Sequence, residues 1–308
     1  MGRYLLGRVL RTLVALWAIV SATFLVMHLI PGNPFLARQL PPAVAQHLLA
    51  RYGLDMPLWR QYVLYWAGLL HGRLGSSMVV PGRTVRQIVA AAFPVSAELG
   101  AEALLWSVTL GVALGLLAAF HLNRAWDYCA LAVAVLGLSV PNFAIAAILD
   151  YVLGVRARLL PVAGWGGFAH TVMPAFALGF MSLALVSRLL RTQGAEVLAM
   201  EYVRTARAKG LAWPAIVVRH VLRNALLPVL TVLGPLAAAV LSGSFAVEQI
   251  FAIPGLGSAY VQSILDRDYP VILGVTVFYA FVLLGFNLLV DVLYGLVDPR
   301  IRLGREGG

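Results

Sequence analysis

The chain has 308 residues, of which 61% are hydrophobic and only 12% are charged. A soluble domain of this length carries about 25% charged residues, and its core cannot bury so much apolar side chain. The composition therefore excludes an ordinary soluble protein and indicates a membrane protein. The formal net charge of +10 is then better explained by membrane topology than by nucleic-acid binding.

Long uncharged windows predict six transmembrane helices, because about 20 helical residues are needed to cross ~30 Å of hydrocarbon. The first span retains its apolar character for longer than a signal peptide does, so an uncleaved signal anchor is expected. The expected fold class is an all-α membrane protein. Its predicted spans are 12–30, 103–120, 128–149, a fourth that begins near Thr171, 225–247 and 269–290.

The spans divide the chain into three parts: 1–30, with the N-terminal tail and the first span, 31–97, an external segment, and 98–308, a five-helix core. Within the external segment, helical pieces are predicted at 43–52 and 58–70. The second piece has the aromatic, amphipathic character of a helix at the lipid surface. A small packed external cap is the alternative, and both remain open.

Glu98 and Glu102 are expected at the outer start of the second span, on one face of the helix. Negative charge is favoured there by the helix dipole, which predicts a capping role. A vestibule that attracts cations is the alternative.

The segment 191–224 between the fourth and fifth spans is rich in positive charge. Helical spacing over 195–209 predicts a helix that Gly210 ends, and Pro214 suits the first turn of a second helix. Small residues such as Thr205 and Ala206 would let another protein pack closely. The alternative is an ordinary basic loop that satisfies the positive-inside bias, which also predicts that both termini are cytoplasmic.

The same segment contains the pieces RTARAKGL and RHVLRN. They resemble the cytoplasmic coupling motif of binding-protein-dependent ABC importers, with Gly210 at the motif's glycine. The departures from the general motif are similar to the B-type permease of the dipeptide, oligopeptide and nickel branch. Further pieces that carry the resemblance are PGNP at 31–34, SVPNF at 139–143, LLPVAGW at 159–165, FAIPGLG at 251–257, RDYP at 267–270 and DPRIR at 298–302.

This resemblance implies a type I ABC importer-like fold in a bacterial inner membrane. The implied partners are a second homologous permease, two cytosolic ATP-binding subunits and an extracytoplasmic solute-binding protein, with no nucleic acid. The implied cargo is a short peptide, with a nickel chelate, haem or another peptide-sized solute as alternatives. The residues implied to contact the ATPase are Arg204, Thr205, Ala206, Arg207, Lys209, Gly210, His220 and Arg223.

The sequence lacks the motifs of an enzyme. Its single lysine, Lys209, is not part of a phosphate-binding loop, and there is no nucleophile elbow or paired-histidine zinc motif. We therefore expect no cofactor, no metal and no catalytic residue, with ATP hydrolysed by another polypeptide. A self-sufficient secondary transporter or channel is the alternative function, but neither mid-membrane coupling charges nor paired halves are seen.

Helix-breaking and small residues are candidates for the translocation path, because freed backbone groups in a membrane must face protein or a cavity. Close helix contacts are the alternative for the small residues. The candidates are Pro141, Asn142, Ser242, Ser244 and Glu248.

Overall fold

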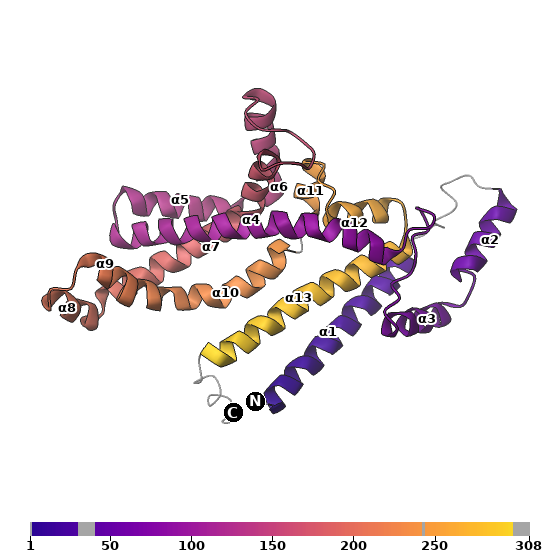
Figure 1. Cartoon of the computed structure of the whole chain (residues 1–308), viewed down its shortest axis with the longest axis horizontal. Coiled ribbons are helices and arrows are strands. Elements are labelled where there is room, and N and C mark those ends of the chain that lie inside the picture. The colour runs from indigo at the N-terminus through magenta and orange to yellow at the C-terminus, as the bar shows by residue number, and fades with distance from the viewer. Residues whose placement is uncertain (1, 30–40, 242–243, 298–308) are drawn as a thin grey trace. The chain divides into compact units, whose positions relative to one another are not determined.

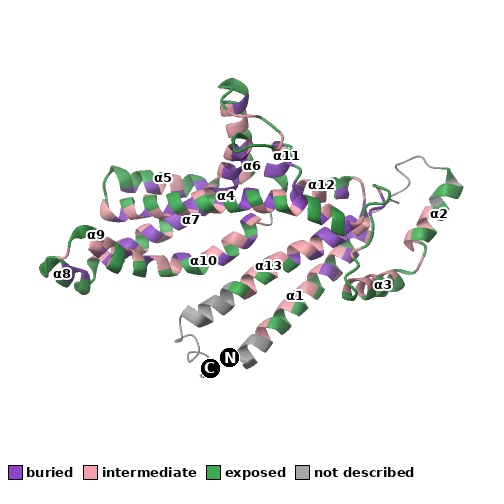
Figure 2. Cartoon of the chain, in the orientation of Figure 1, coloured by how far each residue is buried: buried purple, intermediate pink, exposed green. Residues whose placement is uncertain are grey.

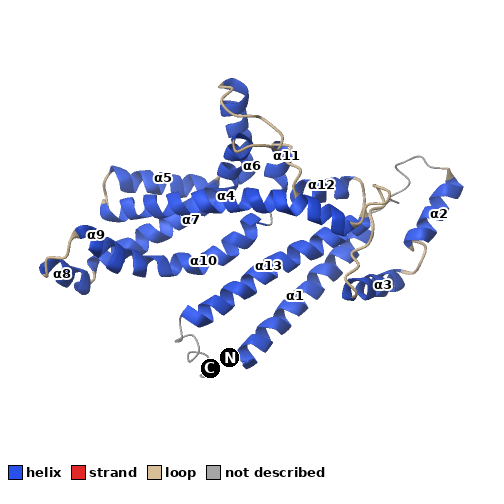
Figure 3. Cartoon of the chain, in the orientation of Figure 1, coloured by secondary structure: helices blue, strands red, loops and turns tan. Residues whose placement is uncertain are grey.

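The computed structural model describes residues 2–29, 41–241 and 244–297 (Figure 1). Regular elements in these ranges are helices, beside one isolated antiparallel bridge between Ser76 and Thr84 (Figure 3). The all-α prediction is confirmed. The elements are α1 (Gly2–Leu29), α2 (Pro42–Tyr52), α3 (Leu58–Leu70), α4 (Val85–Phe120), α5 (Ala125–Ser139), α6 (Asn142–Leu149), η2 (Asp150–Arg156), α7 (Ala169–Ala199), α8 (Glu201–Ala208), α9 (Trp213–Ile216), η3 (Val217–Leu222), α10 (Arg223–Leu241), α11 (Phe245–Ile250), α12 (Leu256–Leu265) and α13 (Tyr269–Val297).

Five stretches of the described chain are long and apolar enough to cross a membrane, and a bent pair of helices makes a possible sixth. The bent pair joins Ala125–Ser139 to Asn142–Arg156 at an angle of 107°. The bend follows from Pro141, because the residue before a proline is kept out of helical conformation, and Val140 has ψ 123°. The predicted third span is thus two helices.

Helix α4 begins much earlier than the sequence predicted. It starts at Val85 and continues through Pro94 to Phe120, so Glu98 and Glu102 lie inside it. The capping role proposed for these two carboxylates is therefore wrong. The span was predicted from the uncharged window alone, whereas α4 is longer than the thickness of a membrane requires.

The chain forms two compact units. The first contains Met1–Val95 and Pro254–Leu288, and its core joins the start of α4 to α12 and α13. Helices α4 and α13 approach closely at Gly274, where a Cβ would lie 2.4 Å from Val85 Cγ1. In the same unit, Phe24 and Met27 of α1 pack against Ile272 and Leu273 of α13. Helices α2 and α3 confirm the two helical pieces predicted for the external segment.

A buried carboxylate holds residues 77–79 in this first unit. Asp268, in the turn before α13, accepts hydrogen bonds from the Ser77 hydroxyl and from the backbone N–H of Met78 (3.0 Å) and Val79 (3.3 Å). Asp268 and Ser77 are both buried. Three donors satisfy the charge, so the carboxylate can be buried at this junction.

The second unit contains Ser96–Ile253 and Leu289–Gly308, and α7 is its most buried long helix. Buried positions run along its length (Figure 2). Glycines allow the neighbours to approach: a Cβ on Gly115 of α4 would lie 2.7 Å from the Ser187 carbonyl oxygen, and one on Gly137 of α5 would lie 2.5 Å from Ala184 Cβ. Such small-residue contacts are the usual way in which helices associate in lipid.

One ion pair, between a buried carboxylate and a partly exposed guanidinium, joins α5 to α7 in this unit. Asp127, only 1% exposed, accepts hydrogen bonds from Nε of Arg191 and from its Nη2 at 3.0 Å, and also from the Asn123 N–H at 2.8 Å. The bidentate geometry is the strong form of a carboxylate–guanidinium contact. The pair fixes the first turn of α5 against α7.

Candidate coupling site and translocation path

The predicted helix at 195–209 is two helices. Helix α7 continues to Ala199, Met200 is extended (ψ 146°), and α8 begins at Glu201. In one straight helix, nine residues at about 100° each would place Ala206 on the face opposite Val197. The break at Met200 lets both side chains enter one apolar cluster. The sequence prediction missed it because neither glycine nor proline marks the position.

Helix α8 ends as the sequence predicted. Gly210 has a left-handed backbone (φ +76°), its N–H donates to the Arg207 carbonyl (2.9 Å), and the Leu211 N–H donates to the Ala206 carbonyl (3.2 Å). These two bonds form a Schellman motif, in which glycine is the favoured residue. A sharp, hydrogen-bonded turn therefore closes the helix.

The inner face of α8 is fixed by packing. Val203 and Ala206 are buried with Ile216 and Val221, and α4 and α7 residues also contribute to this cluster. Of the small residues expected to face a partner, Thr205 is exposed whereas Ala206 is not. Ala206 thus serves to hold α8 in place.

Polar and aromatic contacts tie α8 to the following helices. The Asn224 amide donates to the Tyr202 hydroxyl (3.0 Å) and to the His220 carbonyl (2.9 Å), and the Tyr202 and His220 rings lie 6.0 Å apart. The Arg207 guanidinium lies 4.5 Å from the centre of the Trp213 ring, a cation–π contact. Tyr202, Trp213 and Asn224 were not predicted as site residues.

The outer face of the site is basic. Between residues 201 and 224 the only acid is Glu201, and among the described residues none of the five cations there has an ion-pair partner. Four of them were predicted, and all five are exposed. The cations are Arg204, Arg207, Lys209, Arg219 and Arg223.

A second helix follows the turn, with Pro214 in its first turn as predicted. It continues into η3, a π-helical segment at Val217–Leu222, and then into α10. The sequence did not predict the π-helix. Such segments are rare and occur mostly as single wide turns within helices, frequently at functional sites.

The candidate path residues lie on two helices that contact each other. Pro141 and Asn142 stand at the bend where α6 begins, and α6 packs against α11. Ser244 caps α11 by accepting a hydrogen bond from the Val247 N–H (3.4 Å). Glu248 is completely buried and accepts a hydrogen bond from the Ser96 hydroxyl (2.8 Å). Ser242 lies outside the described residues, as do the pieces 31–34 and 298–302.

The chain matches two family models: the binding-protein-dependent transport system inner membrane component over residues 111–303, and the N-terminal part of such components over residues 1–93. It is 45% identical to the dipeptide transport system permease protein DppB of Bacillus subtilis, over all of both chains. It is 40% identical to the oligopeptide transport system permease protein OppB of Salmonella typhimurium, over 98% of this chain and all of the relative. The chain belongs to the family of binding-protein-dependent transport system inner membrane components, and it is a multi-pass permease subunit.

Proposed function

We propose that the chain is the permease subunit of an ATP-driven importer of dipeptides or oligopeptides. The cargo class is supported by the names of its relatives, because the similarity to a dipeptide permease and to an oligopeptide permease extends over almost all of both chains. The chain forms half of the translocation path and a second, homologous permease forms the other half. Two cytosolic ATP-binding subunits hydrolyse ATP, and an extracytoplasmic solute-binding protein delivers the cargo, so this chain has no catalytic role of its own.

The exposed face of α8 is the contact with the ATP-binding subunit in this proposal. The observation that carries it is the combination of a buried apolar inner face with an outer face whose cations have no ion-pair partner among the described residues. Because α8 is packed on one side, it can move as a rigid body when a partner displaces it. Its cations favour binding to an acidic groove on that partner. Thr205, Arg204, Lys209 and Gly210 supply the contact, and Arg207, Ala206 and His220 hold it in shape. Arg223, exposed at the start of α10, extends the basic surface.

The proposed path runs beside the bend at Pro141 and Asn142 and beside α11, which carries Ser244 and Glu248. Burial of Glu248 fits a conformation in which this part of the path is closed. With the basic loop 191–224 on the cytoplasmic side, both termini are cytoplasmic and α2 and α3 are external.

The test compares Gly210→Trp with wild type in the complex purified with its ATP-binding subunits. A bulky residue at φ +76° strains the turn and projects into the open space beside Gly210. We expect the ATP-binding subunits to be retained about tenfold less, which corresponds to about 1.4 kcal/mol of docking free energy. Gly210→Asn, which tolerates this backbone, is expected to behave nearly as wild type.

The matched control is Gly72→Trp, because Gly72 also has a positive φ (+72°) and open space around it, but lies in the external segment. It should retain the ATP-binding subunits. If the wild-type chain binds no ATPase and alone moves solute down a gradient, the protein is a secondary transporter or channel instead. If both tryptophan variants lose the ATPase equally, the proposed contact at α8 is wrong.

A further inference from the structure

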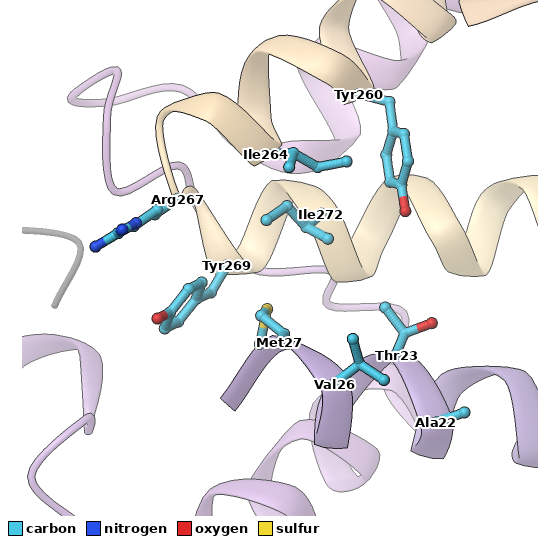
Figure 4. A pocket seen from close by; sticks show the side chains of 9 residues that line it. All are labelled: Ala22, Thr23, Val26, Met27, Tyr260, Ile264, Arg267, Tyr269 and Ile272. Carbon is cyan, nitrogen blue, oxygen red and sulfur yellow. The ribbon is translucent and has the colours of Figure 1, made fainter. Parts of the chain in front are cut away.

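Two cavities are lined by described residues of the first compact unit. One, of about 400 Å³, lies between α1 and the α12–α13 hairpin (Figure 4). Its walls are mostly apolar, with Val26 and Met27 of α1 facing Ile264 and Ile272. Arg267 is the one charged side chain among its nine lining residues.

The other cavity, of about 350 Å³, shares Met27 and Tyr269 with the first but differs in chemistry. It is lined by residues from the end of α1, from α2 and α3, from the segment that precedes α4 and from the start of α13. Its apolar lining includes Phe24, Leu64 and Leu273, and its polar lining includes arginines from two separate segments. We call it the α3 cavity.

The α3 cavity is positively charged. Arg51 and Arg73 both line it, neither has an ion-pair partner among the described residues, and no Asp or Glu is among the lining residues. Two uncompensated cations beside an apolar surface attract an anionic group that is attached to an apolar body.

The side chain of Tyr65 lines this cavity and ends in a buried donor without a partner among the described residues. The Tyr65 hydroxyl is inaccessible to solvent and has no hydrogen-bond partner in the described part of the chain. Burial raises the pKa of Tyr65, so its hydroxyl remains a protonated donor. The amide of nearby Gln61, in contrast, is satisfied by the Met56 carbonyl (2.8 Å) and by His28 (3.2 Å). Buried donors are rarely left unpaired, so the Tyr65 hydroxyl is available to donate to an acceptor that binds here.

The cavity lies at the ends of two stretches that are long and apolar enough to span a membrane. Phe24 and His28 belong to the last turns of the span Gly7–Leu29, and Tyr269 begins the span Tyr269–Leu289. Trp59 of α3 exposes 69% of its surface. Trp and Tyr gather at the interface between headgroups and hydrocarbon. These positions place the cavity beside lipid headgroups.

We propose that the α3 cavity binds the headgroup of an anionic phospholipid. Arg51 and Arg73 contact the phosphate, the Tyr65 hydroxyl donates to a phosphate oxygen, and the acyl chains pass over Phe24 and Leu64. The proposal requires no particular cargo and stands apart from the proposed transport function. With the N-terminus cytoplasmic, the lipid belongs to the outer leaflet.

The test is native mass spectrometry of the purified complex after incubation with phosphatidylcholine vesicles, with or without phosphatidylglycerol. Wild type should retain phosphatidylglycerol over phosphatidylcholine. Arg51→Gln combined with Arg73→Gln should lower this retention roughly tenfold or more, since a hydrogen bond to a charged group is lost at each site. Arg60→Gln on α3, which removes an exposed charge that does not line the cavity, should retain the lipid as wild type does.

Two more variants test the role of the Tyr65 hydroxyl and the choice between the two cavities. Tyr65→Phe should lower phosphatidylglycerol retention severalfold without lowering the melting temperature in phosphatidylcholine alone, because it removes a donor that has no protein partner. Arg267→Gln tests the cavity of Figure 4 and should leave retention unchanged. The proposal is overturned if retention does not distinguish the two lipids, if the α3 cavity variants retain the lipid fully, or if only Arg267→Gln loses it. Displacement of the lipid by inorganic phosphate alone would assign the site to a small anion instead.

Discussion

Helices α1 and α7 are both long enough to cross a membrane, yet they are used differently. The span in α1 is the more hydrophobic, with a mean hydropathy of 2.1 against 1.7, but only 11% of it is buried compared with 61% of the span in α7. Helix α1 exposes large side chains such as Trp17 and Leu29, whereas α7 contacts glycines of its neighbours. Hydropathy therefore predicts that a helix enters the membrane, and small residues predict that it packs against protein there.

The largest expected effect comes from removing the polar anchor of α7. Asp127→Ala leaves the partly exposed Arg191 guanidinium and the Asn123 N–H without their acceptor, and should destabilise the protein by about 2–3 kcal/mol. Thermal unfolding of the purified protein in detergent measures this loss. The control is Arg11→Gln in α1, because Arg11 Nε donates only to the Gly7 carbonyl of its own helix (3.1 Å). That change should cost no more than about 0.5 kcal/mol, and comparable losses in both variants would remove the contrast between the helices.

A single methyl group should act in opposite directions at two glycines. Gly115→Ala places a Cβ against the Ser187 carbonyl, which cannot move as a flexible side chain can, and should destabilise by about 1–3 kcal/mol. Gly7→Ala in α1 meets no atom within 4 Å and should stabilise by up to about 1 kcal/mol through helix propensity. Unfolding midpoints of the two variants give the signs. A stable Gly115→Ala protein would mean that α4 and α7 are less closely packed than described.

The smallest effect concerns a hydrogen bond between Ser21 of α1 and Tyr62 of α3. The Ser21 hydroxyl lies 2.6 Å from the Tyr62 hydroxyl. Ser21→Ala should cost about 1 kcal/mol and increase proteolysis of the external segment. Thr23→Val is the matched control, since the Thr23 hydroxyl donates to the Ile19 carbonyl of α1 itself (2.9 Å). Equal protease sensitivity in both variants would show that this contact does not restrain α3.

Much of the fold could be predicted from local signals. Prolines and apolar spacing gave the helices of the external segment to within a residue, and Gly210 gave the end of α8, because each of these signals acts within one turn. Composition predicted the five stretches that are long and apolar enough to cross a membrane, whereas the predicted third span is a bent pair. The start of α4 was missed because charged residues occur within a helix that extends beyond the apolar window.

Contacts between distant residues could not be predicted. Asp127 and Arg191 are 64 positions apart, and Ser77 and Asp268 are 191 apart, so nothing in either local sequence identifies the partner. The break at Met200 likewise depends on tertiary packing, since only the shared cluster with Ile216 requires Val203 to turn toward it. The sequence therefore predicted which segment forms the coupling site, but only the structure shows which face of α8 is buried and which is exposed.

The π-helical turn at Val217–Leu222 has a mechanical consequence. It holds one more residue than an α-helical turn does, and the surplus lies directly between α9 and the start of α10. If the surplus residue shifts along the helix, each side chain that it passes rotates about the helix axis by one helical position, about 100°. A movement at α8 can therefore reach the membrane as a change in register, which turns side chains around the axis of α10 without bending the helix.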